Sequence, residues 1–170
     1  MKNKILNPDK YLWFSFIEQL LFRSLDRSNP FIRFFVFKLI FLSFGKNNKL
    51  DYGFFCRNPR RIRIGNNVEI NQGCKFFASV RAPNGTITID DDVVIAPFVT
   101  LLAAGQKKEG NRLVDTAGPI HIKSGTYIGA HVVIRYGVTI GKNSIIGAGT
   151  TVVRDVPDNS VIVSAKNRNL

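Results

Sequence analysis

Two histidines, His121 and His131, carry the only imidazole groups of the chain. Imidazole exchanges protons near neutral pH, which suits a histidine to general acid–base chemistry. Two histidines cannot supply a metal site that needs three from one copy of the chain. The run Asp90, Asp91 and Asp92 is interpreted as corner residues that face water. No metal is therefore expected.

The two cysteines of the chain do not form a disulfide framework. Cys74 occupies the fifth place of the hexapeptide INQGCK, so we expect a small, buried core residue. The sequence suggests no role for Cys56.

A stretch over residues 122–156 places an aliphatic residue at every sixth position. These residues are Ile122, Ile128, Ile134, Ile140, Ile146 and Val152. A small or β-branched residue follows each of them four positions later. A period of six suits short strands that turn a corner every six residues. The pattern predicts a triangular parallel β-solenoid whose coils stack their apolar residues.

The run IGAHVV-IRYGVT-IGKNSI-IGAGTT, followed by VVRDVPDNSVIV, resembles the hexapeptide-repeat acyltransferases, which include sugar O-acetyltransferases. The resemblance covers about residues 62–166. It implies an all-β solenoid, a left-handed parallel β-helix, with a short N-terminal helical extension. One coil cannot enclose both substrates, so the resemblance also implies sites between the subunits of a homotrimer. The small number of histidines argues against the carbonic anhydrases that share this fold.

In the acetyltransferases that the chain resembles, a histidine in the loop after the coil at residues 95–101 is the general base. It takes a proton from the acceptor hydroxyl, which attacks the thioester of acetyl-CoA. This sequence reads AGQK at residues 104–107, and the amide of Gln106 cannot usefully accept a proton. Three explanations stay open: a natural non-catalytic relative, an engineered inactive variant, or another base. His131 is the first substitute and His121 the second.

The resemblance implies further site residues. Acetyl-CoA, the acyl donor, would contact Tyr127, Gly129, Ala130, Ala148, Arg154, Lys166 and Arg168. Asn71 matches a position that helps to hold the acceptor. Tight corner packing explains Gly129 and Ala148 equally well, and a corner asparagine can serve its own backbone.

The chain divides into three parts by pattern. Residues 1–61 are expected to be a helical and aromatic extension, 62–163 the β-helix with an excursion loop at about 102–118, and 164–170 a basic tail. Residues 9–25 read as a helix, Asn29-Pro30 interrupts it, and a phenylalanine-rich run follows at 31–44. That run is too short and too charged to span a membrane. Two interpretations of residues 9–44 remain: a pair of interfacial helices on a membrane, or a cap on the first coil or a neighbouring subunit.

The 170-residue chain has a formal net charge of +12, which favours an anionic partner such as phosphates or a membrane surface. Nucleic acid ranks last because no reading motif accompanies the scattered basic residues. The polar first ten residues do not resemble a signal peptide. We expect a cytoplasmic protein, with peripheral contact at the inner face of the membrane as a variant of that prediction.

Two classes of function follow. As an enzyme, the chain would transfer acetyl from acetyl-CoA to a sugar hydroxyl in surface polysaccharide biosynthesis, on a sugar or lipid-linked saccharide. As a binding protein, it would hold acyl-CoA and sugar without turnover. Serine O-acetyltransferase is the second choice among enzymes, although the N-terminal helical part is small for that group.

Overall fold

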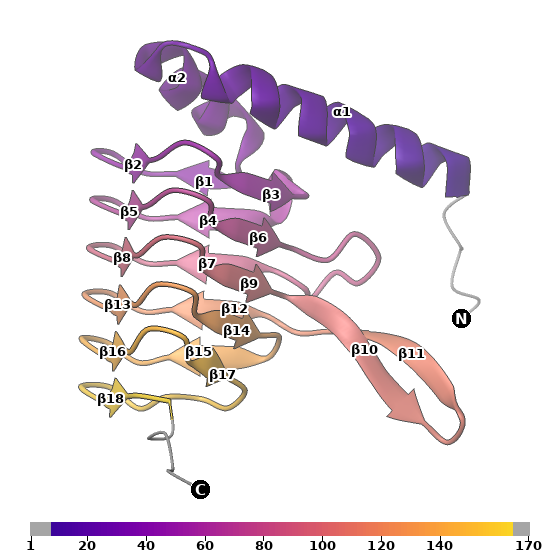
Figure 1. Cartoon of the computed structure of the whole chain (residues 1–170), viewed down its shortest axis with the longest axis vertical. Coiled ribbons are helices and arrows are strands. Elements are labelled where there is room, and N and C mark those ends of the chain that lie inside the picture. The colour runs from indigo at the N-terminus through magenta and orange to yellow at the C-terminus, as the bar shows by residue number, and fades with distance from the viewer. Residues whose placement is uncertain (1–7, 165–170) are drawn as a thin grey trace, which may run out of the picture.

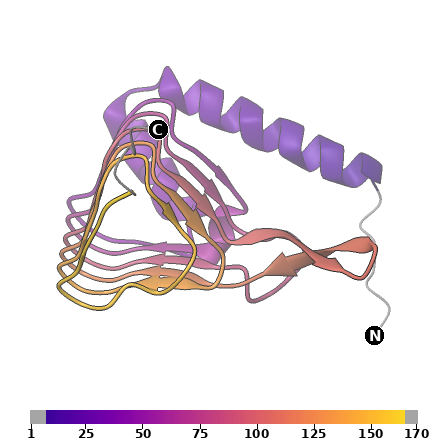
Figure 2. The ribbon, with the colours of Figure 1, turned by 60° about the horizontal axis from the view of Figure 1, so that its bottom comes forward.

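The computed structural model describes residues 8–164. They form two N-terminal helices, a stack of short parallel strands and one hairpin that leaves the stack (Figure 1). The strands of the stack lie in three sheets, so each coil of the chain follows the three faces of a triangular prism, and the hairpin forms a separate two-stranded sheet (Figure 2). This is the left-handed parallel β-helix expected from the sequence.

Each of the three sheets takes one strand from each complete coil, and the final, incomplete coil adds a strand to one sheet only. Sheet 1 contains β1 (Ser43–Phe44), β4 (Ile62–Ile64), β7 (Ile87–Ile89), β12 (Ile120–Ile122) and β15 (Val138–Ile140). Sheet 2 contains β2 (Lys49–Leu50), β5 (Glu69–Ile70), β8 (Val94–Ile95), β13 (Tyr127–Ile128), β16 (Ile145–Ile146) and β18 (Val161–Ile162). Sheet 3 contains β3 (Phe55–Arg57), β6 (Lys75–Phe77), β9 (Thr100–Leu102), β14 (Val133–Arg135) and β17 (Thr151–Val152).

The core is a set of ladders in which identical or similar residues stack from coil to coil. Ile64 pairs in register with Ile89, which pairs with Ile122, which pairs with Ile140. All four are at most 1% exposed. Burial of one such side chain contributes about 1.5–3 kcal/mol, and the six-residue period puts one on every face. The in-phase isoleucines therefore specify the fold.

Three corners join the sheets, and two of them matter for the site. The "hairpin corner", where the chain passes from sheet 3 to sheet 1, consists of residues 58–61, 78–86, 103–119, 136–137 and 153–155. The "Phe98 corner", where it passes from sheet 2 to sheet 3, consists of residues 51–54, 71–74, 96–99, 129–132 and 147–150. A side chain at one of these corners is separated from the other corner by the full width of sheet 3.

The structure starts the solenoid one coil earlier than the predicted residue 62. Strands β1, β2 and β3 pair in parallel with β4, β5 and β6. Phe44, Phe54 and Cys56 fill the core of this coil, and all three are buried. Because aromatic and sulfur side chains replace the isoleucines there, the aliphatic period does not reveal the coil.

Helix α1 (Pro8–Asp26) and helix α2 (Pro30–Ile40) cap the N-terminal end of the solenoid (Figure 1). The side chain of Asn29 caps α2 by accepting a hydrogen bond from the N–H of Phe31, at 2.9 Å. The predicted helical run to residue 44 ends at residue 40, because the following residues turn into the first coil. Neither described helix contains a stretch that is long and apolar enough to span a membrane.

Both cysteines are free and buried. The Cys74 thiol lies 3.2 Å from the carbonyl oxygen of Ala96, and burial raises its pKa to about 11. Burial also raises the pKa of Cys56 well above its ordinary value, and the carboxylate of Glu18 adds to the effect. The prediction that Cys74 is a core residue is confirmed.

Candidate active site

The predicted excursion at residues 102–118 is an antiparallel hairpin. Strands β10 (Ala104–Glu109) and β11 (Arg112–Ala117) pair over their full length, with Gln106 opposite Asp115. The hairpin projects from one corner of the prism (Figures 1 and 2). Most of its side chains are exposed, so it adds little to the core and instead forms a wall beside the corner.

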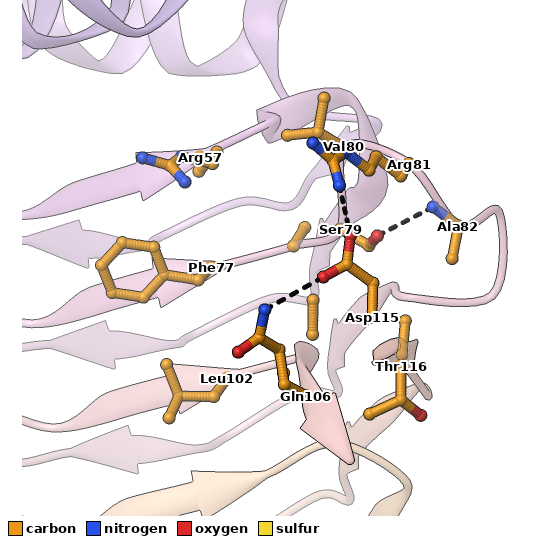
Figure 3. Close-up of a pocket in the computed structure, with 14 residues that line it drawn as sticks. Arg57, Phe77, Ser79, Val80, Arg81, Ala82, Leu102, Gln106, Asp115 and Thr116 are labelled. Atoms are coloured by element: carbon orange, nitrogen blue, oxygen red, sulfur yellow. Dashed lines mark hydrogen bonds and ion pairs between the residues drawn. The ribbon is translucent and has the colours of Figure 1, made fainter. Parts of the chain in front are cut away.

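A cleft of about 510 Å³ lies where the hairpin leaves the solenoid (Figure 3). Its apolar side comes from sheet 3, where Phe77 and Leu102 point outward beside Arg57. Its other walls are the loop at residues 78–82 and the base of the hairpin. The cleft therefore combines residues from three successive coils.

Close packing keeps the loop and the hairpin together. A Cβ atom on Gly85 would lie 2.2 Å from the Cβ of Ser79 and 2.9 Å from the carbonyl oxygen of Ala103. Only glycine therefore fits at this point. The Ser79 hydroxyl also accepts a hydrogen bond from the N–H of Ala82, at 2.9 Å, which shapes the loop.

Three polar side chains meet at the rim of the cleft (Figure 3). The Arg81 guanidinium forms a close ion pair with Asp115. The Gln106 amide donates a hydrogen bond of 3.4 Å to the other carboxylate oxygen of Asp115. Arg81 thus partly neutralises the carboxylate, which remains a hydrogen-bond acceptor. This rim can bind hydroxyl groups, while the Phe77 and Leu102 side chains can contact the carbon face of a sugar ring.

A chain of hydrogen bonds connects the cleft loop to helix α1. Glu18 accepts a hydrogen bond of 2.9 Å from the N–H of Asn58, and the Asn58 amide donates one of 2.8 Å to the carbonyl oxygen of Ser79. Glu18 is only 6% exposed. Burial raises the pKa of its carboxyl group, although the hydrogen bond from Asn58 and the charge of Arg57 act in the opposite direction.

Neither histidine lines this cleft. His131 lies at the Phe98 corner, where its ring stacks on Phe98 with the centroids 5.0 Å apart. His121 is on the outer face of sheet 1, and its Nε2 lies 2.9 Å from a carboxylate oxygen of Asp90. Asp90 is thus the partner of a histidine and not simply a water-facing corner residue. Within one chain, the structure brings neither imidazole to Gln106.

The residues implied for acetyl-CoA fall into two groups. Gly129, Ala130 and Ala148 lie at the Phe98 corner in two successive coils, and Tyr127 is exposed on the adjoining face of sheet 2. A Cβ on Gly129 would lie 2.6 Å from the backbone nitrogen of Ala148, so tight corner packing alone requires glycine there. Arg154 is exposed at the hairpin corner, apart from this group. Lys166 and Arg168 lie outside the described residues.

Asn71, implied for the acceptor, has a structural contact. Its side-chain amide donates a hydrogen bond of 3.0 Å to the carbonyl oxygen of Ile95 in the next coil. Asn71 lies at the Phe98 corner, so one chain does not bring it to the cleft.

Sequence reasoning did not identify Arg57, Phe77, Arg81 or Asp115 as site residues. Phe77, Arg81 and Asp115 each precede or lie within a break in the six-residue phase, which is the one signal they share, whereas no such break adjoins Arg57.

Comparison with known proteins assigns the chain to a family. Residues 119–154 match the model "Bacterial transferase hexapeptide (six repeats)". A solved galactoside acetyltransferase in complex with coenzyme A is 32% identical and superposes with a TM-score of 0.77, covering 95% of this chain and 80% of that one. The chain belongs to the hexapeptide-repeat acetyltransferases.

Other family members match over different shares of their length. A hexapeptide-repeat acetyltransferase from Vibrio cholerae, complexed with acetyl coenzyme A, is 26% identical with a TM-score of 0.81, covering 99% of this chain and 92% of that one. Galactoside O-acetyltransferase of Escherichia coli is 38% identical over 130 residues, which are 73% of this chain. The matched part spans 60% of the length of that enzyme.

Proposed function

We propose that this protein transfers an acetyl group from acetyl-CoA to a hydroxyl group of a sugar or lipid-linked saccharide in surface polysaccharide biosynthesis. Membership of the acetyltransferase family and the acetyl-CoA in the Vibrio cholerae relative support the donor. The observation that supports a sugar acceptor is the cleft beside Gln106, which has an apolar side and an Arg81–Asp115 ion pair at its rim. A cytoplasmic location follows from the donor, because acetyl-CoA is a cytoplasmic metabolite.

The reaction is a simple exchange of acyl bonds. The acceptor oxygen attacks the thioester carbonyl, its proton passes to a base, the carbon–sulfur bond breaks, and coenzyme A leaves as a thiol after protonation. Hydrogen bonds at the cleft rim would hold the acceptor through neighbouring hydroxyl groups. Orientation of this kind lowers the barrier because the reacting groups lose less freedom in the transition state.

The base is the open part of this mechanism. Gln106 can orient a hydroxyl group but cannot take its proton. His131 remains the first substitute, and His121 has the geometry that suits a base, since Asp90 orients its ring. Both lie away from the cleft in the same chain, which favours a site shared between subunits. We therefore propose a homotrimer, in which a face of one prism would meet the hairpin corner of the next.

The donor would lie along the groove between two such subunits. Tyr127, Gly129, Ala130 and Ala148 offer an exposed ring and small residues on one edge of the prism, where a narrow pantetheine arm can approach the backbone. Arg154, and the tail residues Lys166 and Arg168, would face the phosphates. A groove of this kind needs no metal, and no group of three metal-ligating side chains gathers within residues 8–164.

Gln106 favours a second function. A protein that keeps the donor groove and the acceptor cleft, but lacks a base beside the cleft, would bind acyl-CoA and sugar without turnover. The two functions share every binding contact and differ only in the proton acceptor. A turnover assay therefore distinguishes the two functions, whereas a measurement of binding affinity does not.

The test combines binding with product analysis. Isothermal titration calorimetry should show binding of acetyl-CoA that weakens as salt is added, because phosphate contacts are screened. Incubation with a panel of sugars should release free coenzyme A and give an acetylated sugar by mass spectrometry. Binding without an acetylated product would favour the second function. Absence of binding at millimolar acetyl-CoA would contradict both.

A further inference from the structure

The outward faces of α1 and α2 carry large apolar side chains that the described residues leave in solvent. Exposed fractions between 55% and 85% are found for Trp13, Phe16, Ile17, Leu20, Phe31, Ile32, Phe35 and Leu39. We call these eight residues the outer helix face. They lie at the capped end of the solenoid and not on one of its three sheets (Figure 1).

This face is separate from the apolar face that holds the helices on the solenoid. Phe22 and Phe37 point inward, are at most 4% exposed, and each packs against Phe54 of the first coil. The attachment of the cap therefore uses none of the outer helix face. Both helices are apolar on two sides, although an amphipathic helix at a protein surface needs only one such side.

Among the described side chains, the exposed charged groups beside the outer helix face have one sign. Arg23 on α1 and Lys38 on α2 are exposed and follow Phe16 and Phe31 by seven positions, which places each cation on the same side of its helix. Arg27 is exposed in the turn directly after α1. The carboxylates nearby do not balance them. Glu18 is buried, and Asp26 accepts a hydrogen bond from the Gly53 N–H at 3.1 Å and lies 3.9 Å from the Arg33 guanidinium.

We propose that the outer helix face docks on an anionic lipid surface. Aromatic and aliphatic side chains would enter the boundary between headgroups and acyl chains, with the helices in the membrane plane, while Arg23, Arg27 and Lys38 contact lipid phosphates. A second copy of the chain fits this face less well, because pairing would bring the same cations together. Neither described helix can span a bilayer, so the contact is peripheral.

The docked orientation places the candidate site close to the membrane. The hairpin projects from the solenoid on the side toward which α1 overhangs the capped end (Figures 1 and 2). The cleft includes Arg57 of the first coil, directly under the helical cap. A saccharide attached to a lipid would therefore approach the cleft from the capped end of the solenoid. The docking itself does not depend on acetyl transfer.

Flotation of the full chain with vesicles tests this proposal. Vesicles of phosphatidylcholine with added phosphatidylglycerol should carry the protein upward in a density gradient, and pure phosphatidylcholine vesicles should carry much less. Added salt should reduce the recovery. Changing Leu20 and Phe35 together to Ser should weaken partitioning at least about tenfold. Each of Arg23→Ala, Arg27→Ala and Lys38→Ala should weaken it about fivefold.

Matched controls lie far from the helices. Val161→Ser changes an apolar residue whose side chain is 67% exposed, the same fraction as for Leu39. Lys142→Ala removes an exposed cation at the other end of the solenoid. Neither should alter flotation. Equal recovery of the unchanged chain with both kinds of vesicle would overturn the proposal. Recovery of the outer-face variants equal to that of the unchanged chain would overturn it as well. Failure of the unchanged chain to bind vesicles, together with a lower oligomeric mass of the Leu20/Phe35 double variant, would also overturn it. That result would identify the outer helix face as a contact between copies of the chain. Acetyl transfer to a soluble sugar needs no vesicles, so the two proposals fail separately.

Discussion

The rings of Phe98 and His131 stack with their centroids 5.0 Å apart and their planes inclined by 18°. Both residues have a left-handed backbone, with φ of +62° and +57°. Glycines occupy the equivalent corner positions in the neighbouring coils, where Gly73 and Gly149 each have a φ of +70°. A left-handed conformation costs a residue with a side chain about 1–2 kcal/mol, so the ring stack offsets part of a strain that glycine would avoid.

Gly73→Ala and Gly149→Ala should therefore differ in cost. A Cβ at Gly73 would lie 2.5 Å from the Phe98 ring, whereas nothing lies within 4 Å of one at Gly149. Both substitutions introduce the backbone strain, but only Gly73→Ala must also displace the ring. Thermal unfolding should show a melting temperature about 2–4 °C lower for Gly73→Ala than for Gly149→Ala. The difference should vanish in a Phe98→Ala background, and a difference that persists there would contradict the contact.

The sequence predicts the solenoid well because its core is periodic. Ile122, Ile128, Ile134 and Ile140 are all fully buried in the structure. The first coil was missed because Phe54 and Cys56 take the places of aliphatic residues. The excursion at about 102–118 is predicted only as a loop and not as a hairpin, because neither strand shows a buried alternation.

The cleft could not be predicted from the sequence for a different reason. Arg81 and Asp115 are 34 positions apart, and their ion pair depends on how two breaks in the repeat fold against one corner. A contact that joins two irregular segments leaves no trace in the period. The resemblance pointed to Gln106 from its position alone, and the structure adds the side chains around it. The assigned roles of Gln106 and of the other implied site residues stay predictions.

Glu18→Gln should stabilise the protein near neutral pH. The buried carboxyl group has a raised pKa, so the folded protein binds its proton more tightly than the unfolded chain does. Its contribution to stability is full below the ordinary pKa of a glutamate and falls as the pH rises through the raised value. Glutamine keeps an oxygen for the Asn58 N–H and has no charge to bury. Melting temperatures should favour Glu18→Gln by about 2–4 °C near pH 7, with the gain disappearing near pH 4. A gain that is independent of pH would contradict this account.

Both thiols should be inert in the folded protein. The thiolate is the reactive form, and burial raises the pKa of Cys56 and Cys74. A colorimetric thiol reagent at pH 8 should react with neither cysteine of the native chain and with both after denaturation in urea. Fast reaction of one thiol in the native state would show that its coil opens readily.

The Arg81–Asp115 pair should affect the acceptor more than the donor. Arg81→Ala leaves the Asp115 carboxylate without its cationic partner, and should raise the KM for the sugar about tenfold while the KM for acetyl-CoA stays unchanged. Lys107→Ala is the matched control, because Lys107 forms an ion pair with Glu109 further out on the same hairpin, at 2.7 Å. Equal effects of the two substitutions would mean that the hairpin, and not the cleft rim, is responsible.

The most direct test of the account is the release of free coenzyme A by the chain with Gln106 changed to His. If the cleft holds the acceptor and lacks only a base, an imidazole at this position should accelerate turnover by about 10²–10⁴-fold over the unchanged chain. Gln19→His, the same change at an exposed position on α1, should have no effect. His131→Ala and His121→Ala, measured in parallel, identify any base that the unchanged chain already uses. The account places the acceptor in the cleft beside position 106, so it predicts a large gain for Gln106→His whether or not the unchanged chain already uses a histidine of a neighbouring subunit. No gain in coenzyme A release for Gln106→His, with a sugar that the unchanged chain binds or acetylates, would contradict it.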